Sequence, residues 1–103
     1  MSLVLIQTTC ANKKEAKKIA KALVKEKLAA CVQISRIKSF YMWDGKMCSN
    51  KETLLNIKTI KDNFTKVKSK IKELHSYDVP EIIQLNITNS SDDYKDFIKG
   101  NTI

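Results

Sequence analysis

One short stretch of the chain, residues 75–83, concentrates side chains that can carry out chemistry. It reads His-Ser-Tyr-Asp-Val-Pro-Glu-Ile-Ile, and an imidazole, a phenol and two carboxylates fall within seven residues: His75, Tyr77, Asp78 and Glu81. The stretch joins the end of a helical pattern to an apolar strand pattern through the only proline of the chain. Core packing does not require this density of polar groups, so we interpret the stretch as a candidate site.

A second reactive group, the thiol of Cys10, lies two residues before the expected start of a helix at Asn12. The free N–H groups and the dipole of a helix N-terminus lower the pKa of a thiol and favour the thiolate. A thiolate and an imidazole suit copper or zinc better than calcium or magnesium. We therefore expect a soft-metal site at Cys10 and His75, with Glu81 or a neighbouring subunit's Cys31 as a further ligand.

Two alternatives to this metal site stay open. In the first, Cys10 and Cys31 are small buried apolar residues, and His75 only caps the C-terminus of a helix. In the second, Lys58, Tyr77 and Glu81 bind a small anion in a cleft between subunits. Cys48 is expected in a polar hairpin loop as an incidental exposed thiol.

The residue inventory argues against catalysis. The chain has one histidine and two glycines, and most catalytic templates cannot be built from so few. No second carboxylate at a useful spacing accompanies Glu81, and no glycine-rich loop is present to hold a phosphate. We expect no catalytic residues, no required cofactor and no enzyme activity.

The composition is that of an ordinary globular chain of 103 residues, which we expect to form one domain over residues 1–103. No apolar run approaches the roughly 20 residues that span a membrane, and the N-terminus lacks the features of a signal peptide. Three cysteines without a C-x-x-C pair argue against a disulfide framework and suit a reducing compartment. We therefore expect a cytoplasmic protein that does not contact a membrane.

The net charge of +8 raises nucleic acid as a partner. However, eighteen of the nineteen basic residues are lysines, and only Arg36 is an arginine. Base-edge and bidentate phosphate recognition depend on the guanidinium fork, which lysine lacks. Because the lysines also fall on the polar faces of two expected helices, we expect no specific nucleic-acid partner.

The apolar pattern predicts the elements that position these residues. A buried first strand begins at Leu3 and ends near Cys10, and the later strands and helices follow from alternating and helical spacing. We expect strands over about 32–43, 52–60 and 83–87, and helices over about 12–27, from an Asp62 cap to about 74, and after a Ser91 cap. This order predicts an α+β, ferredoxin-like βαββαβ fold with a short C-terminal helix.

This topology also predicts which chain segments meet. Because neighbouring strands are antiparallel, Cys10, His75 and Glu81 belong at one end of the domain, and Cys31 lies at the other end of its own subunit. The second strand would extend roughly 40 Å at about 3.3 Å per residue, whereas the expected radius of gyration is about 13 Å.

The long second strand therefore implies a protruding hairpin between the second and third strands. Its aromatic side chains, Phe40, Tyr41 and Trp43, have no cover within the chain, and a protruding edge of this kind normally pairs with another chain. We expect an oligomer with these aromatic residues at its interface.

Three motifs in the same order resemble the CutA family of divalent-cation tolerance proteins. They are residues 26–32 (Glu-Lys-Leu-Ala-Ala-Cys-Val), residues 40–46 (Phe-Tyr-Met-Trp-Asp-Gly-Lys) and the stretch at 75–83. The resemblance implies a ferredoxin-like homotrimer that is linked to tolerance of copper and other divalent ions, with copper or another divalent metal as its ligand. It also implies an architecture similar to PII signalling proteins, which bind small effectors in clefts between subunits.

The chain departs from the family pattern at three points. Ser76 stands where the family often has proline, Thr8 stands where some bacterial members have cysteine, and one histidine precedes Tyr77 where some members carry two. Each change removes a potential ligand or some rigidity from the site. Two functional hypotheses follow: a soft-metal binding or tolerance protein, and a PII-like trimeric module that binds an anionic effector or a partner at subunit clefts.

Overall fold

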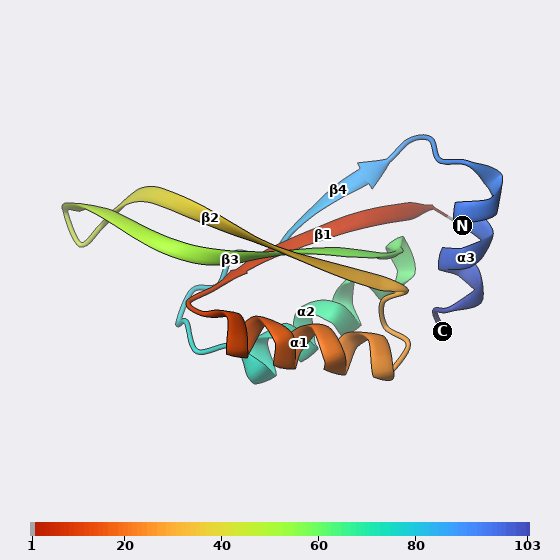
Figure 1. Ribbon diagram of the computed structural model, residues 1–103, viewed down its shortest axis with the longest axis horizontal. Coiled ribbons are helices and arrows are strands. Elements are labelled where there is room, and N and C mark those ends of the chain that lie inside the picture. The colour runs from red at the N-terminus through yellow and green to blue at the C-terminus, as the bar shows by residue number, and fades with distance from the viewer. Residues whose placement is uncertain (1) are drawn as a thin grey trace.

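The computed structural model describes residues 2–103 and contains one four-stranded antiparallel sheet (Figure 1). Along the chain the elements are β1 (Leu3–Cys10), α1 (Lys13–Lys25), β2 (Cys31–Trp43), β3 (Lys46–Ile60), a 3-10 turn η1 (Lys61–Asn63), α2 (Phe64–Leu74), β4 (Ile83–Ile87) and α3 (Asp92–Gly100). The strand order across the sheet is β2-β3-β1-β4. This is the predicted ferredoxin-like α+β arrangement with an added C-terminal helix. No helix within residues 2–103 is both long enough and apolar enough to cross a membrane.

The main core lies between the sheet and helices α1 and α2, which pack side by side under one face (Figure 1). Alternate residues of β1 and β3 point toward the helices, because side chains of a strand alternate between its two faces. Their apolar members are fully buried against the inner sides of both helices: Val4, Ile6, Ile19, Leu23, Leu55, Ile57, Val67 and Ile71. Each large side chain buried in this way contributes about 1.5–3 kcal/mol.

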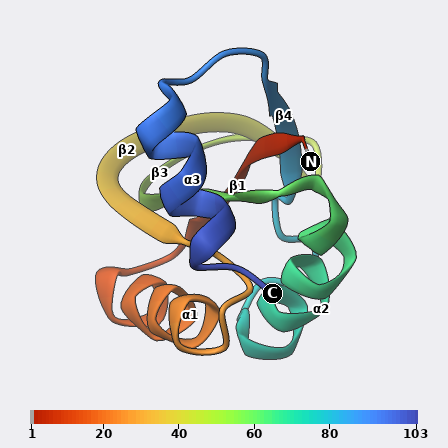
Figure 2. The same cartoon turned by 90° about the vertical axis from the view of Figure 1, so that its right-hand side faces the viewer.

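Helix α3 closes the end of the sheet where β1 begins (Figure 2). Ile98 of this helix is fully buried and packs with Leu3, Ile60 and Ala30 in a second apolar cluster. The N–H group of Ile103 then donates a 3.0 Å hydrogen bond to the carbonyl of Lys27, which ties the chain terminus to the loop after α1. The opposite end of the sheet carries the candidate site.

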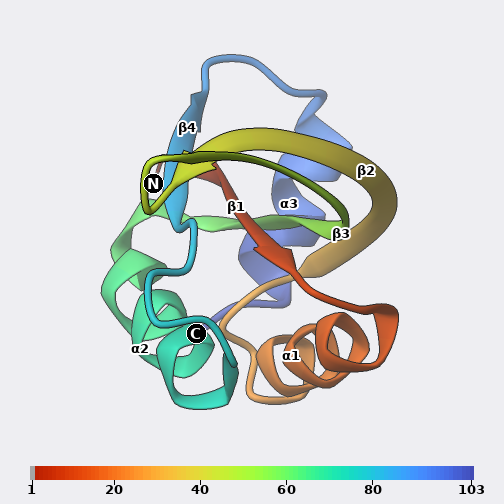
Figure 3. The same cartoon turned by 90° about the vertical axis from the view of Figure 1, so that its left-hand side faces the viewer.

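The β2–β3 hairpin extends well beyond the rest of the sheet, as predicted. Strand β1 ends at Cys10, opposite Thr53, whereas β2 and β3 continue as a pair to Trp43 opposite Lys46. The molecule is therefore 45 Å long but only 25 Å and 21 Å in its other dimensions. Figure 3 shows that the overhanging hairpin is strongly curved.

The hairpin turn explains why β3 begins at Lys46 and not near residue 52, as the sequence pattern suggested. Asp44 and Gly45 both have positive φ values, 53° and 76°, which is the requirement of the two-residue type I′ turn. Backbone pairing therefore begins directly after the turn, through residues whose side chains show no apolar alternation. Cys48 consequently lies half-buried in a strand and not in a loop.

Helix starts were predicted correctly for α1 and α3 but not for α2. The side chains of Asn12 and Ser91 accept hydrogen bonds from the N–H groups of Glu15 (2.9 Å) and Tyr94 (3.3 Å), as helix N-caps do. Asp62 lies instead within η1, and no side chain caps α2. The buried Asn63 holds this junction by donating to the carbonyl of Leu28 at 3.3 Å.

Candidate functional site

Strand β1, helix α2 and the connection after it bring Cys10 and His75 together, as the topology predicted. Cys10 ends β1 and His75 is the C-cap of α2, and the distance from Cys10 Sγ to His75 Nε2 is 3.9 Å. Cys31 lies elsewhere in the same chain, because it pairs with Lys58, whereas Cys10 pairs with Thr53. These two positions on β3 are about 17 Å apart in an extended strand.

Both ring nitrogens of His75 already have hydrogen-bond partners. Nε2 lies 2.7 Å from the carbonyl oxygen of Thr9, and it must carry the proton because a carbonyl only accepts. Nδ1 accepts a hydrogen bond from the N–H group of Tyr77 at 3.1 Å. The His75 side chain is fully buried. A metal ion can reach this imidazole only by displacing the Thr9 or the Tyr77 contact.

The prediction of a lowered pKa for Cys10 is wrong. Burial, together with the negative charges of Glu15 and Glu52, raises the pKa of this thiol to about 12. The thiol faces the core from β1 and is fully buried, and Asn12 already caps the helix N-terminus that was expected to stabilise a thiolate. Across residues 2–103, no group of three or more His, Cys, Asp or Glu side chains is arranged to hold a metal ion.

Glu15 has a positional role that the sequence did not reveal. Its carboxylate accepts hydrogen bonds from the backbone N–H (2.5 Å) and the hydroxyl (3.0 Å) of Ser76. Asn12 accepts a hydrogen bond from the backbone N–H group of Glu15, while the Glu15 side chain contacts the connection after α2. Through these bonds, the start of α1 holds the polar stretch in place.

A cleft of about 500 Å³ opens between the hairpin and the connection from α2 to β4. We call it the hairpin cleft, and its walls are Thr9, Tyr41, Trp43, Glu52, Ser76, Tyr77, Asp78, Val79 and Glu81. The hydroxyl of Tyr77 donates a 2.8 Å hydrogen bond to Glu52 across it. The ring of Tyr77 packs against that of His75, with centroids 4.8 Å apart. The cleft is thus continuous with the His75 network.

Three carboxylates, those of Glu52, Asp78 and Glu81, and no lysine or arginine are among the described residues that line the hairpin cleft. Partial burial raises the pKa of Glu81, and the negative charge of Glu52 raises it further. Burial also raises the pKa of Tyr77, and the hydrogen bond to Glu52 adds to this shift. In the part of the chain that the structure describes, no lysine or arginine forms an ion pair with Glu52, Asp78 or Glu81.

Lys58, predicted to share a cleft with Tyr77 and Glu81, does not lie there within one chain. Its Nζ donates a 3.3 Å hydrogen bond to the hydroxyl of Tyr94 and lies 5.2 Å from the centre of that ring. The physical reason is register, because Lys58 stands opposite Cys31 at the α3 end of the sheet.

Sequence reasoning missed Glu52 as a member of the cleft. A signal for it exists, since a two-residue turn at Asp44 and Gly45 sets the register of the hairpin. In this register Glu52 pairs with Ile37, and period-two alternation places Tyr41 and Trp43 on the same face. The hairpin register could therefore have located the carboxylate beside the aromatic residues.

The hairpin aromatic residues lack cover within the chain, as predicted. Phe40, Tyr41 and Trp43 are 67%, 39% and 57% exposed. Strand alternation separates them, because Tyr41 and Trp43 line the hairpin cleft while Phe40 points to the other face, with Lys38 Nζ 5.5 Å above its ring. The sheet face opposite α1 and α2 also exposes apolar side chains, including Ile83 and Leu85 of β4 at 46% and 44%.

Comparisons with known proteins give a consistent result. The family model described as CutA1 divalent ion tolerance protein matches residues 4–101. The chain is 41% identical to the divalent-cation tolerance protein CutA of Thermus thermophilus, over 95% of this chain and 96% of that one. It is 42% identical to the chloroplastic protein CutA of Arabidopsis thaliana over 96% of this chain, although the match spans only 55% of that relative.

Solved structures agree with this match. The fold superimposes on the crystal structure of CutA1 from Oryza sativa with a TM-score of 0.97 and 36% identity, covering 100% of this chain and 95% of that one. The structure described as the periplasmic divalent cation tolerance protein CutA from Archaeoglobus fulgidus has a TM-score of 0.94 and 36% identity, covering 96% and 97% of the two chains.

Proposed function

Because the chain belongs to the CutA1 divalent ion tolerance family, we propose that it is a non-catalytic homotrimer that acts in tolerance of divalent cations. The observation that carries the proposal is the apolar surface that the folded chain leaves uncovered. This surface includes the exposed side chains of Ile83 and Leu85 on β4 and of Tyr41 and Trp43 on the hairpin. An enzyme would instead be recognised by a convergent set of reacting groups.

The geometry of this surface supports a ring of subunits. Strands β2 and β4 are the two edges of the sheet, and an exposed edge tends to pair with a neighbouring chain. The overhanging part of β2 lies at one edge and short β4 at the other, so pairing between subunits would be head to tail. Head-to-tail contacts leave no free edge only if the ring closes, and we propose three subunits, the number that the family resemblance implies.

We also propose that Cys10 and His75, with a neighbouring subunit's Cys31, bind a soft metal such as copper. Two energetic costs oppose this binding. Binding requires deprotonation of a buried thiol whose pKa is about 12 and release of one His75 hydrogen bond. Metal affinity should therefore rise with pH, because the thiolate is the ligand. This site can be tested by titrating reduced protein with Cu(I) and Zn(II) and repeating the titration on a variant that carries both Cys10→Ser and His75→Ala. Unchanged metal affinity in this double variant would rule the site out.

The alternative of an anionic effector is less well supported. The hairpin cleft holds Glu52, Asp78 and Glu81, and Lys58 contacts Tyr94 at the other end of the sheet. The charge of the cleft within one chain therefore has the wrong sign for an anion. We also propose a reducing, cytoplasmic location, which is supported by three free cysteines and which subcellular fractionation would test.

The oligomer can be tested with two matched substitutions. Leu85 and Val24 are exposed to nearly the same extent, 44% and 43%, but Leu85 lies on the uncovered face of β4, whereas Val24 lies on helix α1, against the other face of the sheet, beside Ala20 and Val32. We expect light scattering to give a trimer mass for the unaltered chain and for Val24→Lys, and a smaller mass for Leu85→Lys. A monomeric unaltered chain at micromolar concentration, or a trimer that tolerates Leu85→Lys, would contradict the proposal.

A further inference from the structure

A row of amide side chains crosses the face of the sheet that α1 and α2 leave uncovered. Strand pairing places Gln33 of β2 opposite Asn56 of β3, and Asn56 opposite Gln7 of β1. Residues directly opposite each other in a sheet point to the same face, and Gln7 also pairs with Ile83 of β4, whose exposed side chain belongs to the uncovered face. We call Gln33, Asn56 and Gln7 the amide row.

Apolar side chains lie on both sides of the amide row. Two positions along the strands, and therefore on the same face, Leu5 of β1 pairs with Leu85 of β4 on one side of the row. Leu54 of β3 takes the corresponding position on the other side. The proposed contact between subunits would cover these leucines and would remove the amide groups between them from water. Because a buried amide is strongly destabilising unless its polar atoms find hydrogen-bond partners, the amide row needs partners in the assembled protein.

Gln7 and Asn56 satisfy only part of their hydrogen-bonding capacity within one chain. The Nε2 atom of Gln7 donates a 2.9 Å hydrogen bond to Oδ1 of Asn56. Each amide side chain can donate two hydrogen bonds and can also accept at its oxygen. Among the residues that the structure describes, Oε1 of Gln7 and Nδ2 of Asn56 have no hydrogen-bond partner. Every subunit therefore presents a free acceptor beside a free donor.

A free acceptor beside a free donor matches a closed ring of subunits. If Asn56 of each subunit donates to Gln7 of the next, every subunit gives one hydrogen bond and receives one, and the ring leaves neither atom unpaired. A neighbour shifted by two residues along its strand would instead place leucines against the amides. In coiled coils, a polar side chain within an apolar contact fixes the register and the number of chains at a cost in stability. The amide row has the same character.

We propose that the amide row selects one arrangement of the subunits, through hydrogen bonds from Nδ2 of Asn56 in each subunit to Oε1 of Gln7 in the next. Gln33 extends the row to the exposed edge of β2, where it adds a further donor and acceptor for the neighbouring subunit. This inference rests on the proposed homotrimer and names the residues that exclude its alternatives. The apolar side chains supply the affinity between subunits, and the amides supply the uniqueness of the assembly.

Replacing both amides together tests the proposal without leaving one of them unpaired. In the variant that carries Gln7→Leu and Asn56→Leu, we expect the subunits still to associate, because the leucines add apolar surface to the contact. Native mass spectrometry should nevertheless show several assemblies in place of the trimer alone. A double variant that forms only the trimer would overturn the proposal.

The chain offers a matched control on the other face of the sheet. Gln84 and Asn86 of β4 are the same two residue types, and Nε2 of Gln84 lies 3.5 Å from Oδ1 of Asn86. They alternate with Ile83 and Leu85, so they do not belong to the uncovered face. The variant that carries Gln84→Leu and Asn86→Leu should therefore form only the trimer. A mixture of assemblies in this control as well would overturn the proposal, because added leucine alone would then explain it.

Single substitutions test the pairing between the two amides. Gln7→Leu or Asn56→Leu alone leaves one amide without its partner in the contact, so each single variant should dissociate at a lower urea concentration than the unaltered trimer. The double variant should resist urea at least as well as the unaltered trimer, because no amide is left unpaired. Light scattering in urea would measure this. Single effects that add up in the double variant would contradict the pairing.

An exchange of the two residue types covers the case in which leucine impairs folding. The variant that carries Gln7→Asn and Asn56→Gln keeps both amides and their combined length. Circular dichroism should show a folded chain, and native mass spectrometry should show only the trimer. A mixture of assemblies in this variant would overturn the proposal.

The unaltered chain separates this inference from the proposed function. If the unaltered chain is monomeric, the homotrimer fails and the inference fails with it. If the unaltered chain is a trimer and the leucine double variant also forms only the trimer, the inference is overturned and the homotrimer stands.

Discussion

The Cys10 thiol shows how burial can outweigh a favourable helix terminus. Two residues before the N-cap of α1, it was expected to gain thiolate character, yet its side chain points from β1 into the core and is fully buried. Desolvation disfavours the charged form of any buried group, and two nearby carboxylates, Glu15 and Glu52, act in the same direction. The thiol is consequently a protonated core residue at neutral pH.

We predict that Cys10 resists alkylation in the native protein. Iodoacetamide reacts with thiolates, so at pH 8 the half-buried Cys48 should be modified well before Cys10, and unfolding in guanidinium should abolish the difference. Mass spectrometry of digested protein would measure this. Modification of native Cys10 as fast as Cys48 would show that the site opens or that its pKa is not raised.

The same thiol predicts a loss of stability at alkaline pH. Because its pKa rises from 9.0 to about 12 on folding, the native state holds this proton more tightly than the unfolded state does. The resulting stability is fully present below pH 9 and is lost as the pH rises toward about 12, at up to about 1.4 kcal/mol per pH unit. Urea unfolding between pH 8 and pH 11 should show a steeper decline for the unaltered chain than for Cys10→Ala; parallel curves would contradict the assignment.

At the scale of elements, the hairpin turn controls the position of the aromatic residues. Asp44 and Gly45 adopt left-handed backbone conformations, which match the twist of the flanking strands. The turn sets the register that places Trp43, Tyr41 and Glu52 on one face. A change of register by one residue would move all of these side chains to the opposite face.

The two glycines of the chain offer a matched test of the turn. A methyl group added at either Gly45 or Gly100 meets no atom within 4 Å, but only Gly45 has a positive φ, at 76°. Gly45→Ala should therefore destabilise the protein by about 1–2 kcal/mol through backbone strain, whereas Gly100→Ala, at the end of α3, should be neutral or slightly stabilising. Chemical unfolding of both variants would measure the difference, and equal effects would show that the turn is not strained by a side chain.

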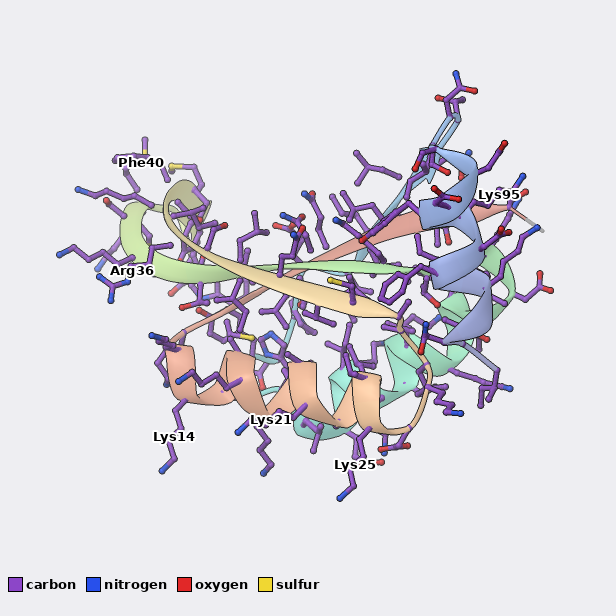
Figure 4. The ribbon with its side chains drawn as sticks, turned by 45° about the vertical axis from the view of Figure 1, so that its right-hand side comes forward. Lys14, Lys21, Lys25, Arg36, Phe40 and Lys95 are labelled. Carbon is purple, nitrogen blue, oxygen red and sulfur yellow. The ribbon has the colours of Figure 1, made fainter. Side chains whose placement is uncertain are left out.

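At the scale of the whole molecule, one group of lysines lies on helix α1, apart from the carboxylates of the hairpin cleft. Lys14, Lys21 and Lys25 extend from the outer side of α1 away from the sheet (Figure 4), while the carboxylates of the hairpin cleft lie at the base of the hairpin. The helical lysines need no partner, because solvent accommodates them. They nevertheless form a surface to which any polyanion is attracted.

We predict that duplex DNA binds this surface weakly and without regard to sequence. Lysines neutralise phosphates by releasing counterions, so the affinity should fall steeply as salt rises from about 50 to about 200 mM. Fluorescence anisotropy with two unrelated duplexes would measure it, and Lys21→Gln with Lys25→Gln should lower the salt dependence. Retention of one particular duplex at physiological salt would contradict the prediction.

Much of the fold could be predicted from local sequence patterns, because helices, strands and caps depend largely on residues that are close together in the chain. The apolar periodicity located the four strands and the three α-helices of residues 2–103, although it placed the start of β3 six residues too late. The capping side chains of Asn12 and Ser91 marked two helix starts. The errors occurred where local pattern and long-range contacts disagree. Asp62 has the chemistry of a cap, but Asn63 is the residue that tertiary packing against Leu28 buries, so the helix begins one residue later, at Phe64.

The sequence by itself determined the order of elements, the overhanging hairpin and the meeting of Cys10 with His75, because alternation, turn chemistry and antiparallel topology suffice for these. Only the tertiary structure decided the protonation of Cys10, the commitment of both His75 nitrogens and the separation of Lys58 from Tyr77. Each of these depends on burial or on register, which set the solvation of a group and its neighbours to within a few ångströms. Spacing along a chain does not carry that information, since residues 65 or 66 positions apart, such as Cys10 or Thr9 and His75, become direct contacts only when the sheet and the helices pack.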